Sequence, residues 1–558
     1  MTMLAKSRMA VLAAAALAAC GDGNNGGGGS GPPPPAADSI TLSGTAARGA
    51  ALAAAAVGVK CASGTPAAVS ATTAGSGAYS VTLEGAGLPC VLRVTGAGGE
   101  VYHSVVAGSA SSGSFVANLS PLTDMMVAQL AGSAPAAFYD GFGSGAAVSA
   151  AALSQAAAYV KSAISKVADL GSMNPATDAL VVGNALDQVI EAAVTGLAAA
   201  GVPLASATQA IAANPAAPTV LASALAAKAA DCAWLKSGSY RFVDPYDDGS
   251  PPQMSGRFQV DAAGLGGVDP EGQAFTMTSD GACQFSLVET DFVTRLLVAS
   301  SGVIVIQGES LVDTERNFAL AIPDQTLPLA EFAGTWNAVS WAPLGAAPGT
   351  GWVGTVYDVT IDTGGQITAL ADCVGLAPCV PESGQRSRLV VNPAGGFDEV
   401  LPDGSIWSRV FLYKDLAGRR VAVWITPERQ LVVAVPKAAQ SLPAAGLVTV
   451  FREVVLRGNG LIDSARSDSS TVTGVDAATK TVARIRASNN LADSQRYDTP
   501  RDGVRYRAAN TCAIGGTAVP CGESVALPAQ GIGFTVTTSV ASDPAATFFG
   551  LSVAKPPQ

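Results

Sequence analysis

The spacing of the cysteines places the strongest constraint on the fold of this 558-residue chain. Beyond Cys20, eight cysteines fall into four neighbouring couples, namely Cys61 and Cys90, Cys232 and Cys283, Cys373 and Cys379, and Cys512 and Cys521. An even, locally arranged set is typical of disulfides in an oxidising compartment. Eight cysteines allow many pairings, and locality alone favours the four neighbouring pairs. With no Cys-x-x-Cys and a single histidine, His103, the sequence predicts no metal site.

The first 37 residues indicate an export signal followed by a tether. Lys6 and Arg8 precede an apolar run over residues 9–19, which is too short to span a bilayer and fits a signal peptide over residues 1–19. The run ends Leu17-Ala18-Ala19-Cys20, which resembles the lipobox of bacterial lipoproteins. The resemblance implies cleavage before Cys20 and a membrane anchor of acyl chains on that residue. The alternative is an ordinary signal peptide with a chance cysteine.

Residues 20–37 and the overall charge bear on location and partners. The stretch after Cys20 is rich in glycine and proline, which favours a flexible tether. Gly21 replaces the aspartate that retains enteric lipoproteins at the inner membrane, so we expect an outer-membrane lipoprotein of the cell envelope. The net charge of −11 without a basic cluster argues against nucleic acid as a partner. The expected partners are the membrane, through the lipid, and an envelope protein or glycan.

Residues 38–118 alternate between apolar and polar positions, with turn residues at short intervals, and this predicts a β-sandwich. Within it, the turn at residues 72–78 is followed by Tyr79-Ser-Val81. This stretch, with the entry at residues 49–57, resembles carboxypeptidase-regulatory-like, transthyretin-type domains. The resemblance implies a spacer or binding module and no reaction.

Residues 119–231 change to an Ala-rich helical pattern. Pro121 suits the first turn of a helix. Longer helices are predicted over residues 147–170 and 177–200, with Gly171 and Gly201 as C-terminal caps.

The remainder returns to β structure and predicts a multidomain α+β protein whose C-terminal antiparallel β region is a barrel or a sandwich. We expect a first β unit at residues 232–330, a second at 331–455 and a C-terminal β section at 456–558. Gly238-Ser-Tyr and Gly334-Thr-Trp open two similar segments, each followed by a cysteine some 40 residues later. This spacing suggests a duplicated unit.

Tryptophans are the candidate binding residues of this region. Gly-x-Trp at the start of a strand faintly resembles the first strand of lipocalin-like barrels, and the resemblance implies that Arg452 packs on Trp336. Trp336, Trp341, Trp352 and Arg452 are therefore candidate ligand-binding residues, and Trp407 and Trp424 extend the set. The alternative, which is favoured, is that these rings fill a core.

No catalytic residue and no cofactor are predicted. His103 lies on an expected strand without a nucleophile or an acid nearby in sequence, so we expect a partly exposed strand residue. The acidic segments beginning at Asp244 and Asp269 suit either Ca²⁺ or ordinary turns. Phosphate-loop and dinucleotide fingerprints do not occur.

Three functions remain open at this stage. The first is a membrane-anchored envelope lipoprotein that acts as a non-enzymatic binding or structural module. The second is a carboxylate-dependent hydrolase of carbohydrate or peptidoglycan fragments, and the third is an adhesin or assembly component. A binder should show a concave aromatic surface, whereas a hydrolase should show two carboxylates in a cleft.

Overall fold

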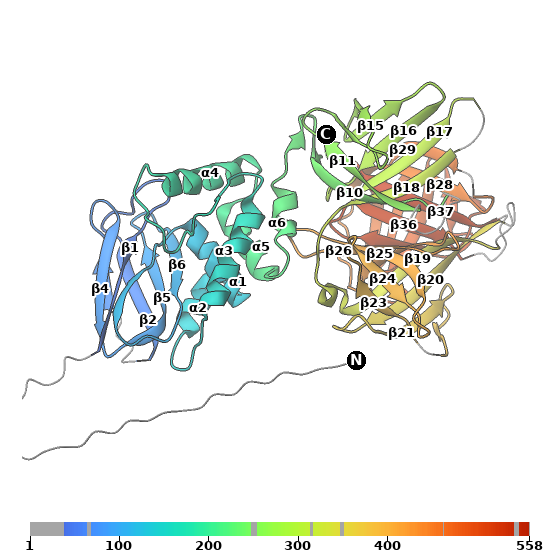
Figure 1. The fold of residues 1–558 in the computed structure, drawn as a ribbon. Helices are drawn as coiled ribbons and strands as arrows, with labels where there is room; N and C mark the ends of the chain where they lie inside the picture. Colours follow the sequence, from blue (N-terminus) through green and yellow to red (C-terminus); the bar gives the residue numbers. More distant parts are fainter. Residues whose placement is uncertain are drawn as a thin grey trace, which may run out of the picture.

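The computed structural model describes residues 38–63, 69–246, 254–312, 316–345, 351–384, 386–460, 462–540 and 546–556. The expected signal peptide, Cys20 and the tether lie outside these residues. Within them the chain is a multidomain α+β protein. Figure 1 shows a small sandwich (blue) beside a layer of helices (teal), with a large β region (green to red) on the other side of the helices.

The N-terminal part is a β-sandwich of two sheets. The sheets have the orders β4-β1-β7 and β3-β2-β5-β6, and β1 runs parallel to β7 but antiparallel to β4. In β4 every second side chain is buried, as expected for a strand with one face on a core. The strands are β1 (Ser39–Thr45), β2 (Ala56–Ser63), β3 (Val69–Thr72), β4 (Ala78–Glu84), β5 (Gly87–Thr95), β6 (Val101–Val106) and β7 (Gly113–Val116).

The six α-helices of the described residues follow the sandwich, and α1 packs against β6. Helix α1 is capped at its N-terminus by Ser120, whose hydroxyl accepts from the backbone N–H of Thr123 in a capping box, and at its C-terminus by Gly132 in the left-handed conformation. The helices are α1 (Pro121–Ala131), α2 (Pro135–Gly141), α3 (Ala150–Ile164), α4 (Ala185–Ala199), α5 (Leu204–Ala213) and α6 (Thr219–Ala224).

Two helices are shorter than the sequence pattern predicts. Helix α3 covers 15 residues of the expected 147–170, and α4 covers 15 of the expected 177–200. The side chains of Ser149 and Asn184 cap the two N-termini, while the segment between the helices forms turns. Among the described helices, none is by itself long and apolar enough to cross a membrane; α4 and α5 satisfy the criteria only jointly, with a 93° bend between them.

The first two β units share one topology. Their nine-stranded sheets have the orders β13-β12-β11-β10-β18-β17-β16-β15-β14 and β22-β21-β20-β19-β27-β26-β25-β24-β23. Adding nine to each strand number of the first order gives the second, which supports the duplication suggested by the sequence. The cysteines do not follow the duplication, because they occupy different places in the two units. Cys283 lies between β14 and β15, whereas Cys373 ends β21, the counterpart of β12.

We call residues 238–323 the first unit and residues 334–436 the second. The strands of the first are β10 (Gly238–Val243), β11 (Ser255–Asp261), β12 (Gly266–Val268), β13 (Ala274–Thr276), β14 (Thr278–Gly281), β15 (Gln284–Val288), β16 (Phe292–Val298), β17 (Ile304–Ser310) and β18 (Arg316–Pro323). Those of the second are β19 (Gly334–Pro343), β20 (Trp352–Ile361), β21 (Ile367–Cys373), β22 (Val380–Pro381), β23 (Arg388–Val391), β24 (Phe397–Val400), β25 (Ile406–Lys414), β26 (Arg420–Ile425) and β27 (Leu431–Pro436). The hairpin of β8 (Lys228–Ala229) and β9 (Cys232–Lys236) precedes the first unit, and the 3₁₀ helix η1 (Leu329–Phe332) precedes the second.

The last sheet closes on itself. Strand β28 pairs with β29 and β37, and the additional pairing of β30 with β31 completes a ring β28-β29-β30-β31-β32-β35-β36-β37. We call it the third barrel. Its strands are β28 (Val448–Arg457), β29 (Ile462–Asp476), β30 (Thr481–Arg486), β31 (Leu491–Tyr497), β32 (Arg505–Arg507), β35 (Ser524–Ala529), β36 (Phe534–Ser539) and β37 (Phe548–Ala554), with a side hairpin of β33 (Cys512–Ile514) and β34 (Thr517–Val519). Because β28 belongs to this ring, the last sheet begins at Val448 and not at residue 456, where the sequence placed the boundary.

The three β units pack around one shared core made from their outer faces. Tyr246 stacks on Trp352, which stacks on Trp341, which in turn stacks on Phe549, with ring centroids 5.1, 5.8 and 5.5 Å apart. These rings come from all three units, so the units share one hydrophobic cluster. The interior of each unit is separate from this core.

Four disulfides form, and they join the neighbouring pairs that locality favours: Cys61–Cys90, Cys232–Cys283, Cys373–Cys379 and Cys512–Cys521. Cys61 and Cys90 stand opposite each other on β2 and β5 of the sandwich. The last two disulfides close short loops of 6 and 9 residues.

Candidate functional site

A cavity of about 360 Å³ lies inside the second unit. Its floor and walls are mostly apolar and aromatic, and polar side chains gather on the side formed by β22 to β24. The lining residues are Trp336, Ala338, Tyr357, Val359, Ile367, Leu370, Glu382, Arg386, Ser387, Glu399, Leu401, Trp407, Trp424, Thr426, Gln430, Val432 and Ala434.

Trp336 forms part of the aromatic wall and is held in one orientation. Its indole Nε1 donates to the carbonyl oxygen of Phe332 at 2.8 Å. The guanidinium of Arg420 lies over the ring, 5.3 Å from its centroid. The prediction that Arg452 packs on Trp336 was wrong, because Arg452 is on β28 in a different sheet.

The cavity wall differs from the equivalent wall of the first unit at several positions that the strand registers define. Trp336 faces Val359 on the next strand and Pro436 on the last strand, just as Tyr240 faces Phe258 and Pro323. By the same strand registers, Ala338 of the second unit occupies the position that Phe242 occupies in the first unit. Two phenylalanines that fill the first unit are therefore replaced by alanine and valine at the cavity wall of the second.

A tyrosine enters the wall from the neighbouring strand. Tyr357 stands opposite Ala338, where the first unit has Gly256 opposite Phe242. The Phe242 ring occupies the space that a side chain at Gly256 would need, since a Cβ there would lie 2.4 Å from the ring. In the second unit the hydroxyl of Tyr357 accepts from Gln430 Nε2 at 3.2 Å, so this exchange places a polar group on the cavity wall.

Glu399 is fixed on the polar side of the cavity. Its two carboxylate oxygens accept from the hydroxyls of Ser387, at 2.5 Å, and Ser408, at 2.7 Å. Ser387 precedes β23 and Ser408 is on β25, so Glu399 on β24 is held from both neighbouring strands. These two hydrogen bonds hold the carboxylate in position.

Glu382 and Arg386 form the second polar pair. Arg386 Nη1 lies 3.5 Å from Glu382 Oε2, and the guanidinium also donates to the backbone carbonyl of Glu382. Burial raises the pKa of Glu382, and the nearby charge of Asp372 raises it further, while Arg386 opposes both effects. The Glu382 side chain is 40% exposed and that of Arg386 is 19% exposed, so the pair can exchange its internal contact for a contact with a ligand.

The arrangement suits a ligand with an apolar body and a polar end. Aromatic and aliphatic walls remove apolar surface from water, Glu399 accepts hydrogen bonds from hydroxyls or amines, and Arg386 donates to oxygen atoms. The cavity lies at the lower end of the size range of small-molecule sites, roughly 300–1,000 Å³.

The other candidate residues do not join this site. Trp341 and Trp352 belong to the shared core between the units, where neither indole is accessible to a ligand. Arg452 lies near Asp280 of β14 and Lys555, and burial lowers its pKa. Its Nε and Nη1 are buried and have no partner among the described residues.

His103 is buried, which corrects the expectation of a partly exposed residue. It is 2% exposed beneath the helices, and its Nδ1 and backbone N–H both bond Asp124 of α1, at 2.8 and 3.1 Å. Burial raises the pKa of Asp124 and the bonds to His103 oppose that rise. The pair joins the sandwich to α1.

The acidic turns behave as turns where the structure describes them. The Asp269 carboxylate accepts from the backbone N–H of Gln273 at 2.7 Å, and the Asp244 carboxylate accepts from that of Tyr246 at 2.8 Å. Residues 247–249 of the segment that begins at Asp244 lie outside the described residues. Within the described ranges, no group of three or more His, Cys, Asp or Glu side chains is placed to hold a metal ion.

Of the tryptophans that the sequence singled out, Trp336, Trp407 and Trp424 line the cavity, but the sequence analysis did not predict the polar side of the cavity. Glu399 shares a strand face with the buried Phe397, and an acid on the apolar face of a strand is the one signal that points to it. Glu382, Arg386 and Ser387 lie in a connection whose sequence carries no motif, and only the closure of the sheet brings them to the tryptophans.

Comparisons with known proteins give no family. No protein-family model matches the chain, and no curated protein matches it. Among solved structures, the vaccine antigen transferrin binding protein B of Haemophilus parasuis aligns with 9% identity over 57% of this chain and 75% of its own, at a TM-score of 0.19. Transferrin binding protein B of Neisseria meningitidis aligns with 9% identity over 55% and 66%, at 0.18. A Nostoc punctiforme protein of unknown function from the DUF3598 family aligns with 11% identity over 41% and 99%, at 0.15. At these TM-scores the alignments carry no conclusion about fold or function.

Proposed function

We propose that this chain is a lipid-anchored lipoprotein of the bacterial cell envelope that acts as a non-enzymatic binding module, and that the cavity of the second unit binds a small amphiphilic ligand. The observation that carries the proposal is the 360 Å³ cavity with tryptophans on one side and fixed polar groups on the other. The first unit, with the same topology, fills its interior with Phe242, Phe258 and Phe285. A cavity at the equivalent place favours binding over packing.

The envelope location rests on the sequence and the disulfides together. Leu17-Ala18-Ala19-Cys20 supplies the lipid-attachment motif, and four disulfides suit an oxidising compartment outside the cytoplasm. The sandwich would then lie next to the tether as a spacer of transthyretin type. An envelope glycan or lipid fragment, with a ring or chain for the aromatic wall and hydroxyls for Glu399, fits the chemistry of the cavity.

The test is a titration of the mature chain with three probes, namely octyl glucoside below its micelle concentration, dodecanoate and a disaccharide of N-acetylglucosamine. Binding of any of them should change the tryptophan fluorescence with saturation. The variant Val359→Phe restores the side chain of the first unit and should fill the cavity. We expect it to lose binding by about tenfold or more, because the ligand is sterically excluded. Val448→Phe, an exposed position on β28, is the matched control.

If none of the probes saturates, or if both variants bind equally well, the cavity is not the binding site. Mass spectrometry of the membrane-bound protein tests the anchor separately, since an acylated peptide beginning at Cys20 is expected.

One observation favours the hydrolase as a second candidate. Two carboxylates, Glu382 and Glu399, line the same cavity, and burial raises the pKa of Glu382 in the direction that a general acid requires. A hydrolase would release nitrophenol from nitrophenyl glycosides, and Glu382→Gln or Glu399→Gln would abolish release while retaining binding. A binding module would release none at any concentration.

A further inference from the structure

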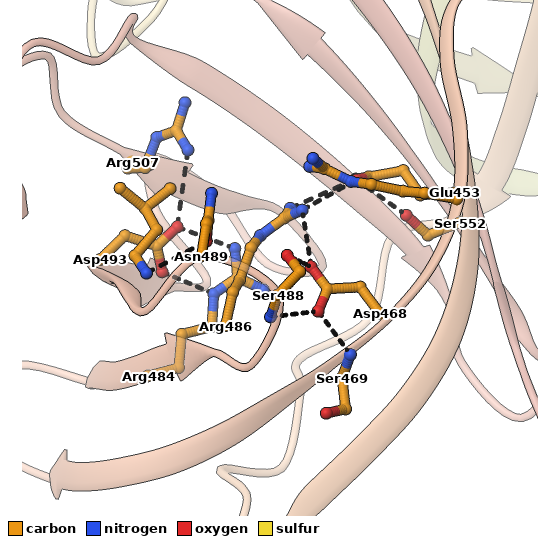
Figure 2. Close-up of polar contacts among 12 residues, drawn as sticks. Glu453, Asp468, Ser469, Arg484, Arg486, Ser488, Asn489, Asp493, Arg507 and Ser552 are labelled. Carbon is orange, nitrogen blue, oxygen red and sulfur yellow. Dashed lines mark hydrogen bonds and ion pairs between the residues drawn. The ribbon is translucent and has the colours of Figure 1, made fainter. Parts of the chain in front are cut away.

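Charged side chains run through the interior of the third barrel, whereas phenylalanines fill the interior of the first unit and the second unit carries its charges on one side of its cavity. Side chains from β28 to β32 and from β37 turn toward one another inside the ring (Figure 2). They include three carboxylates, Glu453, Asp468 and Asp493, and the opposite face of these strands packs on the shared core through residues such as Val454 and Tyr506. The barrel therefore has an apolar outside and a polar inside.

One part of this interior is internally satisfied. Arg486 bonds both oxygens of Glu453, at 2.8 and 3.2 Å, and Asp468 accepts from the hydroxyl and the backbone of Ser488, at 2.7 and 3.0 Å. Figure 2 shows these contacts converging from three strands. A second ion pair, Arg484 with Asp493, is bidentate at 2.6 and 3.0 Å.

The neighbouring part has more cations than anions. Arg505 donates through Nε to Gln440 Oε1 at 2.7 Å and lies over the Tyr497 ring at 4.3 Å; no carboxylate among the described residues pairs with it. Arg507 reaches Asp493 only at 3.5 Å, and its Nε is buried without a partner. Asp493 thus pairs more closely with Arg484 than with Arg507, and Arg505 has no counter-ion of its own among the described residues.

The pKa values of the two arginines reflect this imbalance. Burial lowers the pKa of both Arg505 and Arg507, and the nearby charge of Arg484 lowers both further. Asp498 is the other carboxylate near Arg505, but it is paired with Lys480 at 2.8 Å. Burying several guanidinium charges close together costs free energy unless an anion pairs with them.

An independent observation comes from Gln440, which lies in the segment between β27 and β28. This residue is 7% exposed, its Oε1 accepts from Arg505 and its Nε2 has no partner among the described residues. A buried amide donor without an acceptor costs free energy. The two unsatisfied groups, Gln440 Nε2 beside Arg505 and Arg507 Nε two residues further along β32, are both donors, so what is missing is an acceptor.

We propose that Arg505, Arg507 and Gln440 form an anion-binding site in the third barrel that takes a carboxylate or phosphate group. Such a group offers several acceptor oxygens to guanidinium and amide donors, and it supplies the negative charge that Arg505 lacks and that Arg507 only shares with Arg484. The site is separate from the cavity of the second unit, so a ligand could occupy either one alone.

Isothermal titration calorimetry of the mature chain with inorganic phosphate and with citrate, each in chloride buffer of fixed ionic strength, tests the site. The two probes distinguish a phosphate from a carboxylate source. Arg505→Gln should weaken the preferred anion by about tenfold or more, because it removes a charge-assisted contact. Arg496→Gln removes the same charge from the exposed side of β31 and should leave affinity within about twofold.

Gln440→Glu keeps the test informative if Arg505→Gln fails to fold. It places a carboxylate where the anion would bind, so it should raise the melting temperature without added anion and abolish the further rise that the anion gives the wild type. Saturable binding that Arg505→Gln and Arg496→Gln weaken equally would overturn the proposal, as would the absence of binding by either probe or a lower melting temperature for Gln440→Glu.

Discussion

Tyr240 and Trp336 occupy the same place in the two repeated units and make the same contact. Each is the third residue of its first strand, and each donates a hydrogen bond to the carbonyl oxygen four residues earlier. The Tyr240 hydroxyl donates to Lys236 at 3.0 Å, and the Trp336 indole Nε1 donates to Phe332 at 2.8 Å. The upstream segments differ, a hairpin before the first unit and a 3₁₀ helix before the second. The contact therefore persists through a change in the structure that supplies its acceptor.

The filled interior of the first unit should be sensitive to truncation at Phe258. Its ring lies 5.5 Å from that of Tyr240 and 6.4 Å from that of Phe242. Phe258→Ala should lower the free energy of unfolding by about 3–5 kcal/mol, because it removes apolar contacts and leaves a cavity. Urea unfolding measures the change. Val359→Ala, the equivalent position beside an existing cavity, is the control and should cost less; equal losses would contradict the view that only the second interior is unfilled.

The disulfides should differ in their contribution according to the loops that they close. Cys232–Cys283 spans 51 residues and Cys373–Cys379 spans 6. The chain-entropy relation gives about 4 kcal/mol for the longer loop and about 2 kcal/mol for the shorter. Thermal unfolding of the paired serine variants should rank them in that order. The reverse order would mean that the short loop supports native packing beyond its effect on the unfolded chain.

Acid should destabilise the third barrel through Asp493 and Glu453. Burial alone would raise the pKa of Asp493, but Arg484 and Arg507 outweigh it and hold the pKa below its ordinary value; Arg486 and Arg466 do the same for Glu453. A carboxyl whose pKa is lower in the folded state stabilises the fold above its unfolded pKa, near 4. That contribution is lost as the pH falls through the folded pKa.

Asp493→Asn tests this dependence. It should cost about 3–5 kcal/mol near neutral pH, because it leaves buried guanidiniums without their partner, and the melting temperature should then fall less steeply between about pH 4 and pH 2. Asp502→Asn, an exposed position, should retain the wild-type profile. An unchanged acid slope in Asp493→Asn would show that other groups govern the acid transition.

Asp124 should stabilise the junction between the sandwich and α1. Asp124→Ala leaves the backbone N–H and Nδ1 of His103 without their acceptor, and we expect a loss of about 2–4 kcal/mol in the free energy of unfolding. Asp140→Ala removes an exposed partner of Arg93, 3.6 Å away, and should cost less than about 1 kcal/mol. Chemical denaturation compares the two variants, and similar small losses would exclude a structural role for the His103 contact.

Local patterns in the sequence predict much of the fold. The alternation in residues 78–84 gives β4, and the couples of cysteines agree with the disulfides; Cys61 and Cys90 lie on neighbouring strands, and Cys373 and Cys379 close one short loop. The helix ends were less predictable, because alanine favours helix over the whole of the two predicted stretches, 147–170 and 177–200, whereas the capping bonds of Ser149 and Asn184 decide where the helices begin.

The third barrel shows why its interior could not be predicted. Alternation such as Arg505-Tyr506-Arg507 normally indicates an apolar face on the core and a polar face in water. Here Tyr506 faces the shared core outside the ring while the two arginines face inward. The same two-residue period describes both arrangements, and only the packing of three units against one another selects between them.

The contact of the Arg420 guanidinium with the Trp336 ring could not be predicted from the sequence either. The two residues are on β26 and β19, which are not neighbours but flank β27 in the sheet. Identifying the contact requires the strand order, which no local pattern contains.

The stacked rings of Tyr246, Trp352, Trp341 and Phe549 have a consequence for biogenesis. Ribosomal synthesis delivers the first unit many residues ahead of β37, which carries Phe549. Until that last strand has been synthesised, part of the apolar exterior of the first unit stays exposed to solvent. A nascent chain of this kind needs protection from aggregation until its synthesis is complete, and a truncation that removes only β37 would expose hydrophobic surface on units hundreds of residues away.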